Sequence, residues 1–219
     1  MLSITACSVD AYDKGEGEYS LLTAEMADVT VGSNKYTTAI ETDQGEQLTL
    51  AQPVTVKWME KGDTTYRALV YYKQLTDGKA EIVSMKKASM LVPHLLNEKN
   101  EVQQETMKTD PLYVESIWTS QNKKYVNMRL RLLTGEASHS PEEKAVQTLG
   151  IIDVTPSEGS GEAFFTLYHD QGGQPEYYST TVFLSIPLNE VHADTLTITV
   201  NTYDGLFTRT IYKTVSSTD

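Results

Sequence analysis

The sequence predicts an all-β protein in which a small OB-like five-stranded barrel precedes an immunoglobulin-like seven-stranded β-sandwich. Two observations predict this class. Val, Ile, Thr and Tyr recur in short runs from about residue 24 onward, and Gly, Asp and Asn interrupt these runs. Apolar residues at helical spacing are nearly absent. We therefore expect a barrel over residues 24–88, a linker over 89–109 and a sandwich over 110–219.

The barrel is expected from five short strands that lie close together in the chain. Gly32-Ser33-Asn34 separates the first two strands, and Asp77-Gly78 is a hairpin turn between the last two. A lone sheet of this size would expose its edges, whereas closure into a barrel removes them. The stretches concerned are ADVTVGSNKYTTAI (27–40), QLTL (47–50), TYRALVYYKQL (65–75) and AEIVSMKK (80–87).

The segment 89–109 has a weak β signal and many amide and charged side chains, which is typical of a linker. Met90-Leu91-Val92 and Leu95-Leu96 are too apolar for a free tether, so we expect them to pack against one of the domains.

Seven further strands are expected after Asp110-Pro111. Seven is the number of strands in an immunoglobulin-like sandwich. In KYVNMRLRLL (124–133), Val126, Met128, Leu130 and Leu132 alternate with Tyr125, Asn127, Arg129 and Arg131, so one face should be buried and the other solvated. Asp204-Gly205 predicts another hairpin. The other six strands are expected in LYVESIW (112–118), AVQTLGIIDV (145–154), EAFFTLYHD (162–170), YSTTVFLSIPL (178–188), DTLTITV (194–200) and FTRTIYKTV (207–215).

The amino-terminal 23 residues are predicted to be the remainder of a lipoprotein signal followed by an acidic tether. Ile4-Thr5-Ala6-Cys7 resembles a bacterial lipobox, and Cys7 is the only cysteine. A complete signal would carry a basic and an apolar stretch first, so we expect the natural precursor to begin upstream of Met1. The next residues, SVDAYDKGEGEYS, are polar and acidic, as in a solvated tether. Lipid on Cys7 would anchor the protein to a membrane.

The acidic composition argues against nucleic acid as a partner. Eighteen Lys plus Arg against thirty Asp plus Glu give a net charge of −12, which repels nucleic acid and anionic headgroups at long range. Residues 24–90 hold eight basic and nine acidic side chains, so the expected barrel has no electrostatic funnel for single strands. A single thiol allows no internal disulfide and no cysteine-built metal site.

The motif order resembles that of the NigD-like proteins. It is carried by DPLYVESIWTSQNKKYVNMRLRLL, TLGIIDV, LYHDQGGQPEYYSTTVFLSIPL and ITVNTYDG. This family consists of bacterial lipoproteins with an N-terminal OB-type barrel and a C-terminal β-sandwich, so the resemblance implies the same division of this chain. The family has no assigned catalytic residues, and its name comes from a bacteriocin-associated operon.

The chain contains no motif that nominates a catalytic, metal-binding or cofactor-binding residue. His94, His139, His169 and His192 form no short ligand pair, and no nucleophile elbow or phosphate-binding loop occurs. The Asp170 side chain is expected to bond its own turn backbone. Glycoside hydrolysis needs two carboxyl groups at a defined distance in space, and the sequence does not reveal such distances.

Aromatic side chains are the other candidates. Trp58, Trp118 and several tyrosines could form a platform for sugar rings, but strand aromatics are more often core, and we assign Trp118 to the sandwich core. Tyr177 and Tyr178 point to opposite faces if extended, so one should be exposed as a contact point for a ligand.

These observations predict a non-catalytic lipoprotein of the cell envelope, in the outer membrane and either surface-exposed or periplasmic, which binds a protein or a glycan. One alternative is an immunity or self-protection lipoprotein associated with a bacteriocin, and another is a glycan-binding accessory of an outer-membrane uptake system.

Overall fold

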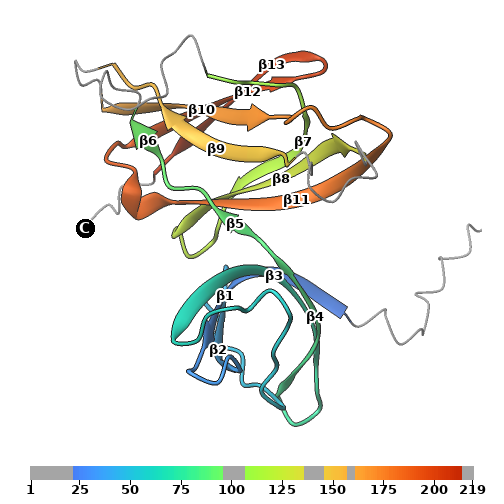
Figure 1. The fold of residues 1–219 in the computed structure, drawn as a ribbon. Helices are drawn as coiled ribbons and strands as arrows, with labels where there is room; N and C mark the ends of the chain where they lie inside the picture. The colour runs from blue at the N-terminus through green and yellow to red at the C-terminus, as the bar shows by residue number, and fades with distance from the viewer. Residues whose placement is uncertain (1–21, 96–106, 136–145, 157–160, 214–219) are drawn as a thin grey trace, which may run out of the picture.

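The computed structural model describes residues 22–95, 107–135, 146–156 and 161–213, and over these ranges the chain is built almost entirely of strands. Four strands form an N-terminal unit, and nine strands form a sandwich above it (Figure 1). Among the described residues no helix has the length and apolar character needed to cross a bilayer. The all-β class predicted from the sequence is therefore confirmed.

The N-terminal unit is one antiparallel sheet of order β2-β1-β3-β4. A tight turn joins β3 to β4, and Gly78 in it, at a φ of +81°, adopts the left-handed conformation that such a turn requires. The Lys79 backbone N–H donates to the Asp77 carboxylate in the same turn. The strands are β1 (Leu22–Val31), β2 (Thr37–Thr42), β3 (Thr64–Gln74) and β4 (Ala80–Lys87).

The described strands of this unit do not close into a barrel. The segment QLTL, expected as a strand, makes only isolated bridges, from Gln47 to Glu41 and from Leu50 to Ala80. These bridges nevertheless reach both edges of the sheet, β2 through Leu48 and β4 through Thr49. The sheet curls around its own apolar core, so a short irregular segment is enough to cover its open side.

The sandwich contains two mixed sheets, of order β13-β12-β10-β9-β6 and β5-β11-β8-β7, in which β5 is Ser89–Met90 and β6 is His94–Leu95. All seven strands expected after residue 110 are present. They are β7 (Tyr113–Thr119), β8 (Tyr125–Thr134), β9 (Thr148–Asp153), β10 (Glu162–Asp170), β11 (Tyr178–Pro187), β12 (Thr195–Thr202) and β13 (Gly205–Tyr212), with the short 3-10 helix η2 (Leu188–Glu190) after β11.

The alternating residues of these strands form the sandwich core. Met128 and Leu130 of β8 face Phe165 of β10 and Ile198 of β12, and all four side chains are buried. On the other face of β8, Arg129 is exposed as expected. Asn127 is fully buried, however, so the prediction that this whole face is solvated is wrong at that position.

The segment expected as a linker contributes to the sandwich. Two short strands, β5 (Ser89–Met90) and β6 (His94–Leu95), pair in parallel with β11 and β9. Leu91 between them enters the sandwich core, as its apolar character suggested, whereas Met90 and Val92 are exposed. Leu96 lies outside the described residues. The chain therefore passes from β4 into the sandwich without a free tether at this point.

Candidate functional site

The outer face of β3 meets the sandwich and defines the interface between the two units. Alternation along a strand places every second side chain on one face, and on β3 these are Arg67, Leu69 and Tyr71. Each has a neighbour in register on β1, namely Asp28, Met26 and Ala24 respectively. The facing residues of the sandwich come from β8 and β11, where Asn127 pairs with Ser185 and Arg129 with Phe183.

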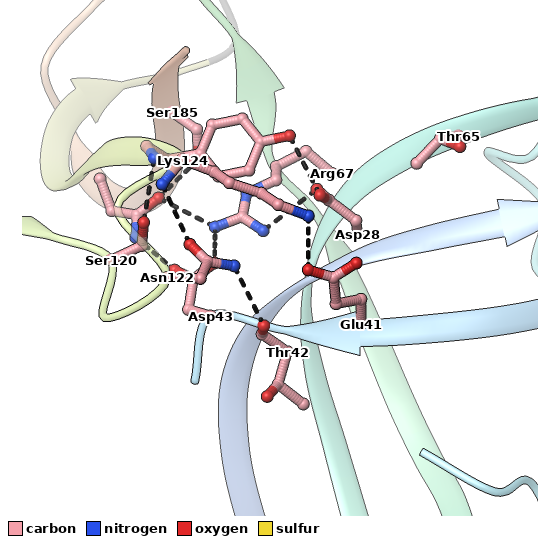
Figure 2. A network of polar contacts seen from close by, with 12 residues as sticks. Asp28, Glu41, Thr42, Asp43, Thr65, Arg67, Ser120, Asn122, Lys124 and Ser185 are labelled. Atoms are coloured by element: carbon pink, nitrogen blue, oxygen red, sulfur yellow. Dashed lines mark hydrogen bonds and ion pairs between the residues drawn. The ribbon is translucent and has the colours of Figure 1, made fainter. Parts of the chain in front are cut away.

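A buried arginine lies at one end of this interface. Figure 2 shows the Arg67 guanidinium surrounded by acceptors from both units. It donates to Asp28 Oδ1 at 3.2 Å and to Asp43 within its own unit, and to Asn127 Oδ1 at 3.2 Å and Ser185 Oγ at 3.1 Å in the sandwich. The Arg67 side chain is 1% exposed. Four acceptors thus satisfy a cation that would otherwise be costly to bury.

Secondary contacts tie the acceptors of Arg67 together. Asn127 Nδ2 donates to Asp43 Oδ2 at 2.6 Å, and Ser185 Oγ donates to Asn127 Oδ1 at 2.7 Å. The Tyr125 hydroxyl donates to Asp28 Oδ2 at 3.1 Å. We call these six residues, Asp28, Asp43, Arg67, Tyr125, Asn127 and Ser185, the Arg67 network.

Burial and the nearby Asp28 carboxylate raise the pKa of Tyr125 to about 12, because both disfavour the phenolate. The phenol therefore remains a hydrogen-bond donor at neutral pH.

The turn between β7 and β8 adds contacts at the edge of the network. The Asn122 backbone N–H donates to Asp43 O at 2.8 Å, and its side chain donates to Thr42 O at 3.3 Å. Lys124 forms an ion pair with Glu41 beside them (Figure 2). Together with the Arg67 network, these contacts fix the orientation of the N-terminal unit on the sandwich.

Apolar packing continues from the network along the interface. Met26, Leu69, Ala88 and Phe183 are buried together, with Trp118 packed against them. The prediction that Trp118 lies in the sandwich core is therefore wrong, because its side chain is half-buried at the interface. The physical reason is that the outer face of β7, which a lone sandwich would expose, is covered here by the N-terminal unit.

Beyond this apolar contact the two sheet faces enclose a groove of about 530 Å³, which we call the interface groove. The N-terminal unit lines it with Ala24, Leu69, Tyr71 and Lys86. The sandwich lines it with Ser116, Trp118, Arg129, Thr181 and Phe183. The groove therefore combines three aromatic rings, three hydroxyl groups and two cations.

A smaller hollow of about 320 Å³ shares Ala24, Leu69 and Trp118 with the interface groove. Its character is acidic, because Glu25 and Asp43 line it. Glu25 Oε1 accepts a hydrogen bond from Gln44 Nε2 at 2.6 Å, whereas Oε2 is buried without a partner. Burial raises the pKa of Glu25 above its ordinary value.

The residues predicted from the sequence lie elsewhere. Cys7 and the lipobox residues Ile4, Thr5 and Ala6 fall outside the described residues. Tyr177 and Tyr178 are 79% and 56% exposed, at the start of β11 and away from the interface groove, so both rather than one face solvent.

The turn after β10 has structural contacts. The Asp170 carboxylate accepts a hydrogen bond from the Gly172 N–H at 2.9 Å, as expected, and pairs with Lys108. His169 is buried, with Nδ1 2.9 Å from Asp110 O and Nε2 3.2 Å from Gln147 Oε1. No group of three or more His, Cys, Asp or Glu in the described part of the chain is placed to hold a metal ion.

Sequence reasoning missed Arg67, and a signal for it was present. In TYRALVYYKQL the residues alternating with the core positions Ala68, Val70 and Tyr72 include Leu69 and Tyr71. A strand that is apolar on both faces is covered on both faces. An arginine in the middle of such a strand requires buried acceptors.

These features define the class of the protein: a two-unit β protein in which a curled sheet is fixed by a buried arginine network to a two-sheet sandwich. The family model described as the NigD-like C-terminal beta sandwich domain matches residues 94–213. The chain therefore belongs to this family, in agreement with the resemblance seen in its motifs. No curated protein matches the chain.

Solved structures share the fold across both units. A NigD-like immunity protein from Bacteroides caccae ATCC 43185 is 24% identical, with a TM-score of 0.64 over 85% of this chain and 91% of that chain. A protein described as toxin-related, from Parabacteroides distasonis ATCC 8503, is 16% identical, with a TM-score of 0.63 over 87% and 92%. A protein described as a lipoprotein, from Bacteroides fragilis NCTC 9343, is 11% identical, with a TM-score of 0.60 over 90% and 100%.

Proposed function

We propose that this protein is a non-catalytic binding protein of the cell envelope, anchored by lipid on Cys7, and that the interface groove receives its ligand. The observation that carries the proposal is the groove itself. Its two walls come from separate units, and the Arg67 network fixes them against each other before any ligand arrives. A binding site held in its bound geometry loses less conformational freedom on association.

The anchor is supported by the lipobox pattern at Ile4 to Cys7 and by the acidic segment that separates it from β1. The similar protein described as a lipoprotein is in accord with it. We propose the outer membrane as its place, with the folded part surface-exposed or in the periplasm.

The anchor is tested with the natural gene, including its upstream sequence, expressed in its host. We expect mass spectrometry of the membrane-bound protein to find acyl chains on Cys7, and Cys7→Ser to leave an unlipidated precursor. Ser8→Ala, at the neighbouring position, is the matched control and should be lipidated normally. An unmodified Cys7 in the native protein would overturn the anchor.

The use of the groove is tested separately. A bulky side chain placed at its floor, as in Ala24→Trp, should abolish capture of the ligand from the host cell surface, because Ala24 is exposed and lines the groove. Thr180→Trp changes an exposed residue of β11 outside the groove and should leave binding intact. Equal binding by both folded variants would remove the groove from the proposal.

A second candidate is an immunity or self-protection lipoprotein, which the likeness to the NigD-like immunity protein favours. Deleting the gene should then make the host sensitive to a toxin encoded beside it. Unchanged sensitivity would exclude this candidate and leave the binding proposal standing.

A further inference from the structure

We propose that the ligand of the interface groove is an acidic oligosaccharide, whose carboxylate or sulfate group lies between Lys86 and Arg129 while a sugar ring packs against the aromatic wall. This inference rests on the proposed function, because it takes the groove to be the ligand site. It adds the chemical class of the ligand and the direction in which the ligand lies.

The charge of the groove is opposite to that of the protein. The chain carries a net charge of −12, yet the groove is lined by two cations and by no carboxylate. Lys86 on β4 is exposed and has no ion-pair partner among the described residues. A cation left unpaired in a strongly acidic protein attracts a specific anion only from close range.

Arg129 is the second cation that lines the groove. Its Nε pairs with Glu115 Oε2 at 2.6 Å, which holds the guanidinium plane in place on the outer face of the sandwich. The side chain is 51% exposed, and Glu115 is its only ion-pair partner in the described part of the chain. Its remaining N–H groups are therefore available to an anion, for which a planar guanidinium offers paired donors.

The hollow that adjoins the groove disfavours anions. This hollow presents Glu25, whose carboxylate has one buried oxygen without a partner, whereas the charge of Asp43 beside it is balanced by Arg67. An acidic group is therefore stabilised beside Lys86 and repelled beside Glu25. This asymmetry orients the ligand, with neutral hydroxyl groups toward Glu25 as hydrogen-bond donors.

The aromatic wall of the groove suits a sugar ring. Trp118 and Tyr71 are half-buried and come from facing sheets. The face of an aromatic ring carries negative potential, which attracts the polarised C–H groups of a pyranose. The hydroxyl groups of Tyr71, Ser116 and Thr181 have no hydrogen-bond partner among the described residues, so they are free to bond to sugar hydroxyls.

A peptide is the competing occupant of this groove. Extended peptides bind by adding a strand to a sheet edge, where backbone groups are free. Leu69 and Tyr71 on β3 and Arg129 on β8 lie on inner strands, whose backbone groups are already paired with a neighbour on both sides. Lys86 on β4 and the β7 residues Ser116 and Trp118 lie on edge strands, so the test below also includes a peptide. The groove volume of about 530 Å³ falls within the usual range for small ligands, about 300–1,000 Å³.

The test is calorimetric titration of the full chain with oligogalacturonate and with chondroitin sulfate oligosaccharides, the carboxylated and sulfated probes. Maltooligosaccharides of matched length are the neutral comparison. We expect at least one acidic probe to bind, at least tenfold more tightly than the neutral one and more weakly as salt is raised.

Two charge reversals then locate the site. Lys86→Glu should weaken binding of the acidic probe at least tenfold. Lys87→Glu is the matched control, because Lys87 is the adjacent exposed lysine of β4 and does not line the groove, and it should bind within twofold of the unchanged protein. Trp118→Phe, which keeps a ring in the apolar contact, should weaken binding without altering the unfolding midpoint.

Each other outcome overturns the inference. Equal binding of acidic and neutral sugars removes the role of charge, and equal loss in the two lysine variants moves the site away from the groove. If a poly-glutamate peptide competes with equal affinity, the site does not select a sugar. If no oligosaccharide binds, the ligand is not an acidic oligosaccharide. In that last case the proposed function survives if Ala24→Trp still abolishes capture of the native ligand.

Discussion

The guanidinium carbon of Arg67 on β3 lies 4.1 Å from the centre of the Tyr125 ring on β8. The stacked pair joins the two units, and both side chains also bond to Asp28, Arg67 through its guanidinium and Tyr125 through its hydroxyl. A cation placed over an aromatic face in a desolvated site adds a favourable interaction to the hydrogen bonds. The rigidity of the interface groove depends on this contact and on the carboxylates around it.

Replacing Arg67 is expected to destabilise the protein strongly. Arg67→Met keeps the apolar stem but leaves Asp28 and Asp43 without their cation, and breaking a buried ion pair from one side costs about 3–5 kcal/mol. The free energy of unfolding, from urea denaturation, measures the loss. Arg131→Met is the control, because the half-buried Arg131 pairs with Glu115 and lies over the Tyr113 ring near the surface, and its loss should cost only about 1 kcal/mol. Similar losses in both variants would contradict a central role for Arg67.

Asn127→Asp tests the acceptor side of the network with almost no change in shape. The substitution removes the Nδ2 donor to Asp43 and places a second carboxylate beside it. We expect a loss of about 1–3 kcal/mol at pH 7, partly offset by the added attraction to Arg67. The loss should shrink as the pH falls, because two close carboxylates hold a shared proton more tightly than the unfolded chain does. A loss that is independent of pH would show that repulsion is not its cause.

The strands of this protein follow from local sequence signals, whereas the Arg67 network depends on contacts between residues far apart in the chain. Periodicity and turn residues predicted the strands well, because both are local: Asp77-Gly78 makes its hairpin, and β8 alternates as expected. Burial of Asn127 is not local, since it depends on a second sheet that covers the outer face of β8. Trp118 was assigned to the wrong core for the same reason. The predicted closure of the barrel is also wrong, because the segment that covers the open side of the sheet makes only two isolated bridges, at Gln47 and at Leu50, and forms no strand.

Alkaline unfolding should report on Tyr125. Its pKa of about 12 in the folded protein lies above the ordinary value of 10.0, so the folded state favours the protonated phenol. The resulting stability is fully present below pH 10 and is lost as the pH rises from 10 toward 12, by about 1 kcal/mol after allowance for solvent screening. Tyr125→Phe should remove this part of the pH dependence while costing the bond to Asp28. Parallel stability curves for the two proteins across this range would contradict the prediction.

Glu25→Gln is expected to stabilise the protein at neutral pH. Burial raises the pKa of Glu25, and its Oε2 atom has no hydrogen-bond partner. The ionised form is therefore disfavoured in the folded state. The amide is uncharged and has nearly the same shape, and its oxygen can still accept the bond from Gln44 Nε2. Because the side chain is only partly buried, the gain should be below about 1 kcal/mol.

The gain should depend on pH. The pKa of Glu25 is higher in the folded protein than in the unfolded chain, so ionisation lowers the stability as the pH rises through that pKa. The gain should therefore appear at pH 7 and vanish below about pH 4, where the carboxyl is protonated in both states. Thermal unfolding of both proteins at pH 7 and at pH 4 measures this difference. Glu81→Gln, at an exposed position on β4 outside the groove and its hollow, is the matched control and should shift neither midpoint. A destabilised Glu25→Gln variant at pH 7 would mean that the fold needs the ionised carboxylate, and would contradict the prediction.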